Sequence, residues 1–278
     1  MPGELKPNGN DFRPQDRDES ATVATESASQ PLVLIPVEAA DVARHRRRNV
    51  AIWLAAALAL IAIAALAYKH KVDPIRAQEA FDAGSRMLKG ARYPQAILYF
   101  DQAIQLKSGF SDAYLMRARA FEADGKTASA IADFTKVIEM RPNDPGPLLE
   151  RGRVFIDGKD YQSAIQDAAA ALALDSNLAE AYFMRGTAVR GMGNLESALN
   201  DFNRAVKLAP TQVHYFERGI TYQMMNRHNE AIEDFTVVIK FEPDAASGYY
   251  SRAKSERAIG DTKHAEEDHH TGRVIDGR

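Results

Sequence analysis

The feature that most constrains this fold is a motif that recurs six times, at intervals of 34, 34, 34, 33 and 34 residues. An alanine marks each copy. Within residues 111–144, one apolar stripe of helical spacing precedes the polar turn Asp124-Gly125-Lys126 and a second stripe follows it. One such helix pair cannot bury both stripes, so the period predicts stacked helix pairs. The alanines are Ala96, Ala130, Ala164, Ala198, Ala231 and Ala265.

Two further positions recur with the alanine. A small residue lies twelve positions before it, and prolines 142, 210 and 243 close three of the copies. Over residues 77–278 the pattern resembles the tetratricopeptide repeat family. The resemblance implies an all-α right-handed superhelix whose concave face, lined by the first helix of each pair, binds peptides or protein partners. The small residues are Gly84, Ala118, Gly152, Gly186, Gly219 and Ala253.

The predicted domain organisation has three parts. Residues 1–49 are rich in proline, charge and small polar residues, which predicts a disordered tail. Residues 50–68 are expected to span a membrane, and residues 77–278 to form the solenoid. Its six units are expected near residues 77–110, 111–144, 145–178, 179–211, 212–245 and 246–278.

The membrane prediction depends on the 19 uncharged residues of VAIWLAAALALIAIAALAY. As a helix they span about 28 Å, close to the hydrocarbon thickness of ~30 Å. Arginines before the segment outnumber the basic residues after it, which favours a cytoplasmic N-terminus. Together with this bias, the alanine- and leucine-rich anchor and the plain domain plan suggest a bacterial inner-membrane protein with periplasmic repeats. Ala65-Leu66-Ala67 resembles a signal-peptidase site, but it lies far from the N-terminus, so an uncleaved signal anchor is preferred.

Five units share an arginine before the small residue and an aspartate before the aromatic position, whereas the first unit has neither. Their joint presence predicts an ion pair within each unit, because an arginine fork can bond a carboxylate twice. The alternative is an arginine ladder that reads acidic peptides. The expected pairs are Arg117–Asp133, Arg151–Asp167, Arg185–Asp201, Arg218–Asp234 and Arg252–Asp268.

The family resemblance also places a partner-binding groove on the first helices. The family's clamp for chaperone C-terminal tails needs lysines and asparagines, which Leu115, Arg119, Phe183 and Thr187 do not match, so a chaperone-tail cochaperone is not expected. Some of the groove aromatics are expected to pack between repeats instead. The expected groove residues are Phe81, Leu115, Arg119, Leu149, Arg153, Phe183, Thr187, Phe216, Ile220, Tyr250 and Lys254.

Two units depart from the pattern. Unit three has Ala168 at the aromatic position, which predicts a thinner core and a bending point. The last unit has Glu256 and His269 at positions that are apolar elsewhere, as expected of a terminal cap with a polar face.

Other functional classes find little support. The chain has no cysteine, and its formal net charge of −3 does not favour nucleic acid. Gly125-Lys126-Thr127 lacks the first glycine of a phosphate-binding loop, since Ala120 stands there. The histidines after residue 263 lack zinc spacing and are interpreted as part of a frayed polar terminus. We therefore expect no catalytic residue, metal, cofactor or small-molecule substrate.

The sequence thus predicts a non-enzymatic, membrane-anchored scaffold or adaptor that binds a protein or peptide partner. Two alternatives remain open: an accessory subunit of a membrane enzyme complex, and a cleaved, soluble periplasmic binding module.

Overall fold

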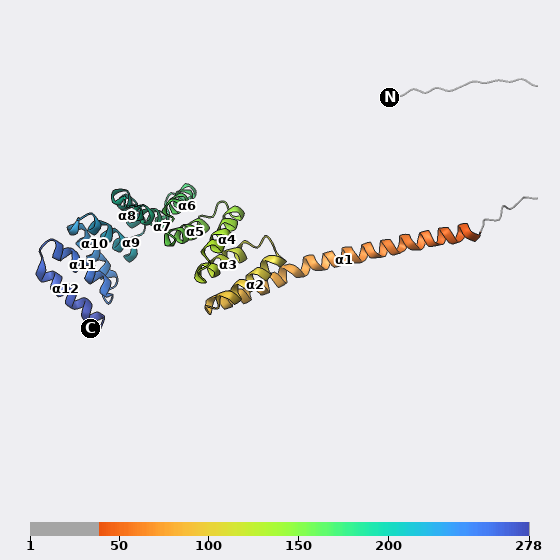
Figure 1. The fold of residues 1–278 in the computed structure, drawn as a ribbon, viewed down its shortest axis with the longest axis horizontal. Helices are drawn as coiled ribbons and strands as arrows, with labels where there is room; N and C mark the ends of the chain where they lie inside the picture. Colours follow the sequence, from red (N-terminus) through yellow and green to blue (C-terminus); the bar gives the residue numbers. More distant parts are fainter. Residues whose placement is uncertain (1–38, 278) are drawn as a thin grey trace, which may run out of the picture. The chain divides into compact units, whose positions relative to one another are not determined.

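The computed structural model describes residues 39–277, and over that range the chain is all-helical (Figure 1). A long first helix, α1, spans Ala39–Lys89. The others are α2 (Tyr93–Leu106), α3 (Ser111–Ala123), α4 (Thr127–Met140), α5 (Gly146–Asp157), α6 (Tyr161–Leu174), α7 (Ala179–Gly191), α8 (Leu195–Leu208), α9 (Gln212–Met224), α10 (His228–Phe241), α11 (Ala246–Ala258) and α12 (Thr262–Ile275).

Helix α1 contains both the apolar segment and the first helix of unit one. Of the described helices, it alone is long and apolar enough to cross a membrane, and its apolar window has a mean hydropathy of 2.7 and is not buried. The predicted disordered tail is wrong for residues 39–49, which are helical. Alanine and arginine favour helix, and extending a formed helix avoids the cost of a new nucleus. The rest of the predicted tail lies outside the described residues.

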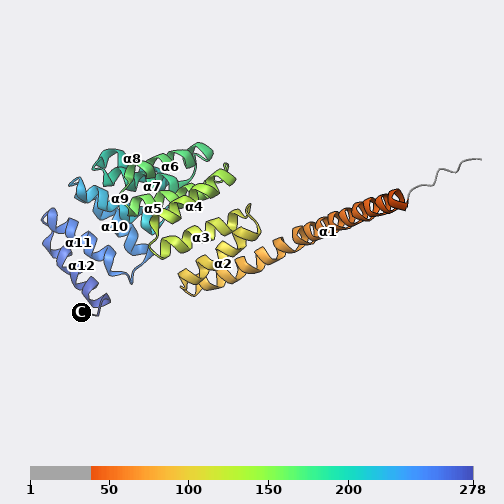
Figure 2. The ribbon, with the colours of Figure 1, turned by 45° about the vertical axis from the view of Figure 1, so that its right-hand side comes forward.

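From α1 onward, the helices form six successive antiparallel pairs, which stack on one another (Figure 2). Four phenylalanines at the aromatic position, Phe100, Phe134, Phe202 and Phe235, are fully buried. The small residue on the facing helix makes room for the ring: a Cβ on Gly219 would lie 2.8 Å from the Phe235 ring. Each phenylalanine is therefore the centre of its own small core, and removing one costs about 3–5 kcal/mol.

Unit three fills the same space differently. A Cβ on Gly152 would lie 2.6 Å from the Met184 methyl group, so that side chain occupies the volume that phenylalanine fills elsewhere. Met184 belongs to α7 of the next unit and is 4% exposed. The prediction of a thin core was therefore wrong, because the flexible methionine compensates for the small Ala168.

The turn inside each pair has one residue in the left-handed region. Three of the six are glycine, as in Gly125 with φ 74°, but Ala91, Lys159 and Asn226 adopt φ values of 54°, 62° and 58°. The next N–H bonds a carbonyl five residues back, as in Lys126 N to Phe121 O at 2.8 Å. This Schellman arrangement satisfies carbonyls at the helix end and fixes the reversal of the chain.

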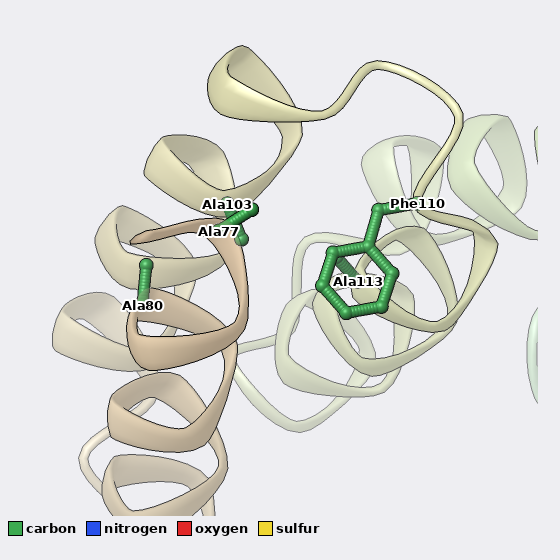
Figure 3. Packing of buried hydrophobic residues seen from close by; sticks show 5 residues of the cluster. All are labelled: Ala77, Ala80, Ala103, Phe110 and Ala113. Carbon is green, nitrogen blue, oxygen red and sulfur yellow. The ribbon is translucent and has the colours of Figure 1, made fainter. Parts of the chain in front are cut away.

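Units one and two pack through small side chains. Ala77 and Ala80 of α1 lie close to Ala103 of α2, and the ring of Phe110 packs beside Ala113 in the same cluster (Figure 3). All five residues are buried. Short side chains let the helices approach closely, which fixes the loop between α2 and α3 against α1.

Candidate partner-binding groove

The first helices of successive units are joined by long side chains. Arg119 of α3 donates two hydrogen bonds to Glu150 of α5, at 2.7 and 2.5 Å. Gln223 of α9 donates to the Ser255 hydroxyl of α11 at 2.6 Å and to the Ser251 carbonyl at 2.7 Å. We call Arg119–Glu150, Arg190–Glu217 and Gln223–Ser255 the first-helix ladder. These contacts place first helices side by side, as a continuous groove requires.

Of the cations expected in the groove, Arg119 is already engaged. Its hydrogen bonds to Glu150 raise the pKa of Arg119 above the ordinary value. Arg153 has a looser partner, with its Nε 3.7 Å from Glu122, and its side chain is 56% exposed. Burial raises the pKa of Glu122. Lys254 on α11 is also exposed. Arg153 and Lys254 therefore remain accessible to a partner's anionic groups.

The predicted groove aromatics pack against the cores of their units. Phe81 lies 5.8 Å from Phe100, measured between ring centroids, and Phe183 lies 5.8 Å from Phe202. Phe216 contacts Phe235 in the same way, and Tyr250 contacts His269. All four groove aromatics are half-buried, which leaves only part of each ring available to a partner.

The remaining predicted groove residues are half-buried and small or aliphatic. Leu115 packs beside the core around Phe134, and Leu149 packs beside the core formed by α5, α6 and α7. Thr187 donates its hydroxyl to the Phe183 carbonyl, so it is satisfied within its own helix. Ile220 on α9 is half-buried as well.

The five arginine–aspartate pairs form bidentate bonds within their units. Their bonds measure 2.6–2.9 Å, and each aspartate is buried with an exposed fraction of 3–8%. The bonds are Arg117–Asp133, Arg151–Asp167, Arg185–Asp201, Arg218–Asp234 and Arg252–Asp268. This geometry commits the arginines to the scaffold rather than to a ligand.

Four of these arginines also reach the preceding unit. Arg117 donates to Asp101 at 2.5 Å, and Arg151 and Arg252 donate to threonines at the same relative position. Arg218 reaches Asn203. Arg185 shows no such second bond within the described residues, because Ala169 stands sixteen positions before it. Its side chain is accordingly 31% exposed, against 18–20% for the others.

The C-terminal histidines do not gather into a metal site. Within residues 39–277, no group of three potential metal-ligating side chains is brought together. The frayed-terminus interpretation is wrong, since α12 runs to Ile275. Asp261 caps its N-terminus and bonds the His264 ring at 2.7 Å, which raises the pKa of His264.

Two stretches match family models described as tetratricopeptide repeat: residues 76–145 and residues 179–212. The chain is a tetratricopeptide repeat protein. Among solved structures, MamA (residues 41 to the end) from Desulfovibrio magneticus RS-1 is 24% identical with a TM-score of 0.56, over 60% of this chain and 96% of that one. Pseudomonas aeruginosa pilF is 14% identical with a TM-score of 0.62, over 73% and 93%. At these identities the likeness shows the fold alone.

Curated relatives match over a shorter stretch. Hsc70-interacting protein 1 of Drosophila melanogaster is 40% identical over 95 residues, which is 34% of this chain and 25% of that protein. The Hsp70-Hsp90 organizing protein of Triticum aestivum is 30% identical over 105 residues, 38% and 18% of the two chains. This tetratricopeptide repeat protein thus spans about a quarter or less of the length of these two relatives.

Sequence reasoning missed the acidic and amide members of the ladder, Glu150, Glu217, Gln223 and Ser255. The spacings within the three ladder pairs are 31, 27 and 32 residues, which is not constant. A search for opposite charges about one repeat apart on first helices would have found the two ion pairs of this tetratricopeptide repeat protein.

Proposed function

We propose that this tetratricopeptide repeat protein is a non-enzymatic scaffold that binds a protein or peptide along its first helices, and that α1 anchors it in a membrane. The partner site comprises the apolar floor of Leu115, Leu149 and Ile220 together with the exposed cations Arg153 and Lys254. A segment with acidic groups flanking apolar side chains matches this surface.

The observation that supports the proposal is that the arginines differ in their bonding partners and in their exposure. The five paired arginines hold helix pairs together and Arg119 holds neighbouring units together, whereas Arg153 is 56% exposed with its acidic neighbour 3.7 Å away. A cation that the scaffold does not need is available to a ligand. The names of the relatives, which refer to Hsc70, Hsp70 and Hsp90, support a protein partner, although the expected mismatch with the chaperone-tail clamp argues for a different ligand.

The anchor is supported by the apolar window of α1, which is unburied and ends near the first repeat. We place the N-terminus in the cytoplasm and the solenoid in the periplasm, following the arginine bias. Because the chain has no cysteine, a single Ala170→Cys substitution on α6 gives a clean topology probe. Labelling by a membrane-impermeant maleimide in intact spheroplasts is expected, and labelling only after lysis would contradict this orientation.

The binding proposal is tested by site-specific photo-crosslinking of the full chain in native membranes. A photoreactive residue replaces Arg153 or Lys254 in the groove, and Lys136 of α4 or Lys207 of α8 in matched controls on second helices; all four positions are exposed. We expect one protein adduct from both groove positions and none from the controls. Equal adducts from all four positions, or adducts from the controls alone, would refute the groove assignment.

Alkaline carbonate extraction of the same membranes tests the anchor separately. Retention in the pellet is expected, whereas release with a mature N-terminus at Tyr68 would indicate the cleaved soluble module. An adduct that also requires residues 50–68 would instead indicate an accessory subunit whose apolar helix packs on a membrane enzyme.

A further inference from the structure

A cavity of about 830 Å³ lies between α1 and the loop that joins α2 to α3. Its α1 wall begins with the apolar residues Ile63, Leu66 and Ala67, and its loop wall runs from Leu106 to Gly109. Every lining residue belongs to the compact unit that starts at Ala62. The cavity is therefore a property of the repeat-bearing part of the chain.

The polar end of the cavity is lined by charged and hydrogen-bonding groups. Lys69, His70 and Asp73 follow the apolar residues along α1, and Lys107 of the loop lines the same cavity. With a rise of about 1.5 Å per residue, Lys69 lies only ~3 Å beyond Ala67 along the helix. The α1 wall thus passes from apolar residues to Lys69 within a single helical turn, and Lys107 lines the same cavity from the loop.

The loop that carries Lys107 is held in place. Phe110 is 7% exposed and packs with Ala77, Ala103 and Ala113 (Figure 3). The Lys107 N–H bonds the Ala103 carbonyl at 2.9 Å, and its ammonium lies 4.6 Å from the centre of the Phe110 ring. Lys107 therefore presents its charge from a fixed backbone.

The same end also offers hydrogen-bond acceptors. Pro74 lies inside α1 and lines the cavity, and proline has no N–H to give to the carbonyl four residues earlier, that of His70. Asp73 adds a carboxylate. Lysines suit an anion, and oxygen acceptors suit the hydroxyl groups of the same ligand.

We propose that this cavity binds an anionic glycerophospholipid of the phosphatidylglycerol type. The phosphate lies between Lys69 and Lys107 beside His70, the glycerol hydroxyls donate to Asp73 and the His70 carbonyl, and an acyl chain follows Ile63 and Leu66. The inference rests on the proposed membrane anchor, which would place the apolar wall among acyl chains and the lysines at the headgroups.

The test uses the full chain purified in a neutral detergent, where no anionic surface attracts lysines in general. Native mass spectrometry measures the retention of added phosphatidylglycerol and phosphatidylcholine. Charge-assisted hydrogen bonds predict at least a roughly tenfold loss of phosphatidylglycerol affinity in the Lys69→Gln/Lys107→Gln variant. The control is Lys71→Gln, on the same helix but outside the cavity lining, which should change the affinity less than about twofold.

Several outcomes would overturn the proposal. Equal losses in the control and the cavity variant, or equal affinity for phosphatidylcholine, would show that no specific headgroup site exists. Competition by free glycerol phosphate at the same concentration would show a soluble-anion site instead of a lipid site. If the double variant loses helix content, Lys107→Gln alone is measured, and an unchanged affinity there also refutes the proposal.

The failure of the lipid site is distinguishable from the failure of the anchor. Carbonate-resistant membrane association without phosphatidylglycerol selectivity overturns the lipid proposal alone. Release into the carbonate supernatant overturns both.

Discussion

The pair Arg185–Asp201 offers a sharp test of what the within-unit ion pairs contribute. Its two bonds measure 2.8 and 2.7 Å, and no second carboxylate, amide or hydroxyl bond to the preceding unit accompanies it among the described residues. The single substitutions Arg185→Ala and Asp201→Ala and their combination therefore form a double-mutant cycle with few competing contacts. Arg117→Ala would be a poorer choice, because it also breaks the bond to Asp101.

The magnitudes follow from burial. Asp201 is 8% exposed, so Arg185→Ala strands a buried carboxylate and should cost about 3 kcal/mol, the lower end for breaking a buried pair. The Arg185 side chain is 31% exposed and can turn to water, so Asp201→Ala should cost less, about 2 kcal/mol. Because the second substitution removes an already unpaired group, the double variant should cost ~3 kcal/mol rather than ~5 kcal/mol.

Native-state hydrogen exchange suits this measurement, since units of a repeat protein can open separately. The local opening free energies of α7 and α8 are compared in the four proteins at one pH. Additive losses to within about 0.5 kcal/mol would refute the claim that the two side chains stabilise the unit as a pair.

Three further predictions concern single sites. Met184→Ala should lower the opening free energy of α5 and α6 by about 2–5 kcal/mol by hydrogen exchange, and Ala168→Phe should restore part of the loss; no change would show that Met184 does not fill unit three. Lys159→Gly should raise the urea midpoint by relieving a left-handed backbone, a gain of about 1 kcal/mol, whereas a drop would contradict that strain. Burial, followed by the negative charge of Asp268, raises the pKa of Glu256 in the folded protein. The protonated carboxyl is therefore the form that favours folding. It is fully populated below the unfolded-state pKa and is lost as pH rises through the folded-state pKa. Glu256→Gln should therefore protect α11 and α12 at pH 7 with a benefit that fades toward pH ~4; an equal benefit at both pH values would exclude titration as its cause.

The repeat period alone predicted most of the fold. Alanine, small residue and aromatic recur in one register, so the packing inside a pair can be derived from one unit and copied to the rest. The pairing of Arg117 with Asp133 follows from the same register, because the arginine and the aspartate are both present in five units and both absent from the first. Contacts inside a unit are thus accessible to sequence reasoning wherever the register repeats.

Contacts between units were not accessible in that way. No repeated residue indicates how deeply one helix packs against the next. The sequence therefore did not predict that Met184 occupies the place of the missing phenylalanine. Glu150 was overlooked because its partner Arg119 lies 31 residues away, a spacing that differs from the period. Of the three cations expected in the groove, Arg119 is bonded to Glu150, whereas the side chains of Arg153 and Lys254 are exposed.

The position of Met184 also determines how the chain can be divided. A fragment that ends at residue 178 would retain Gly152 and Ala168 but lose the side chain that fills the space between them. Its last unit would carry an open hole at the position that Phe100, Phe134, Phe202 and Phe235 fill in units one, two, four and five. Fragments for binding studies should therefore end after unit two or continue through unit four, since units three and four share one interior.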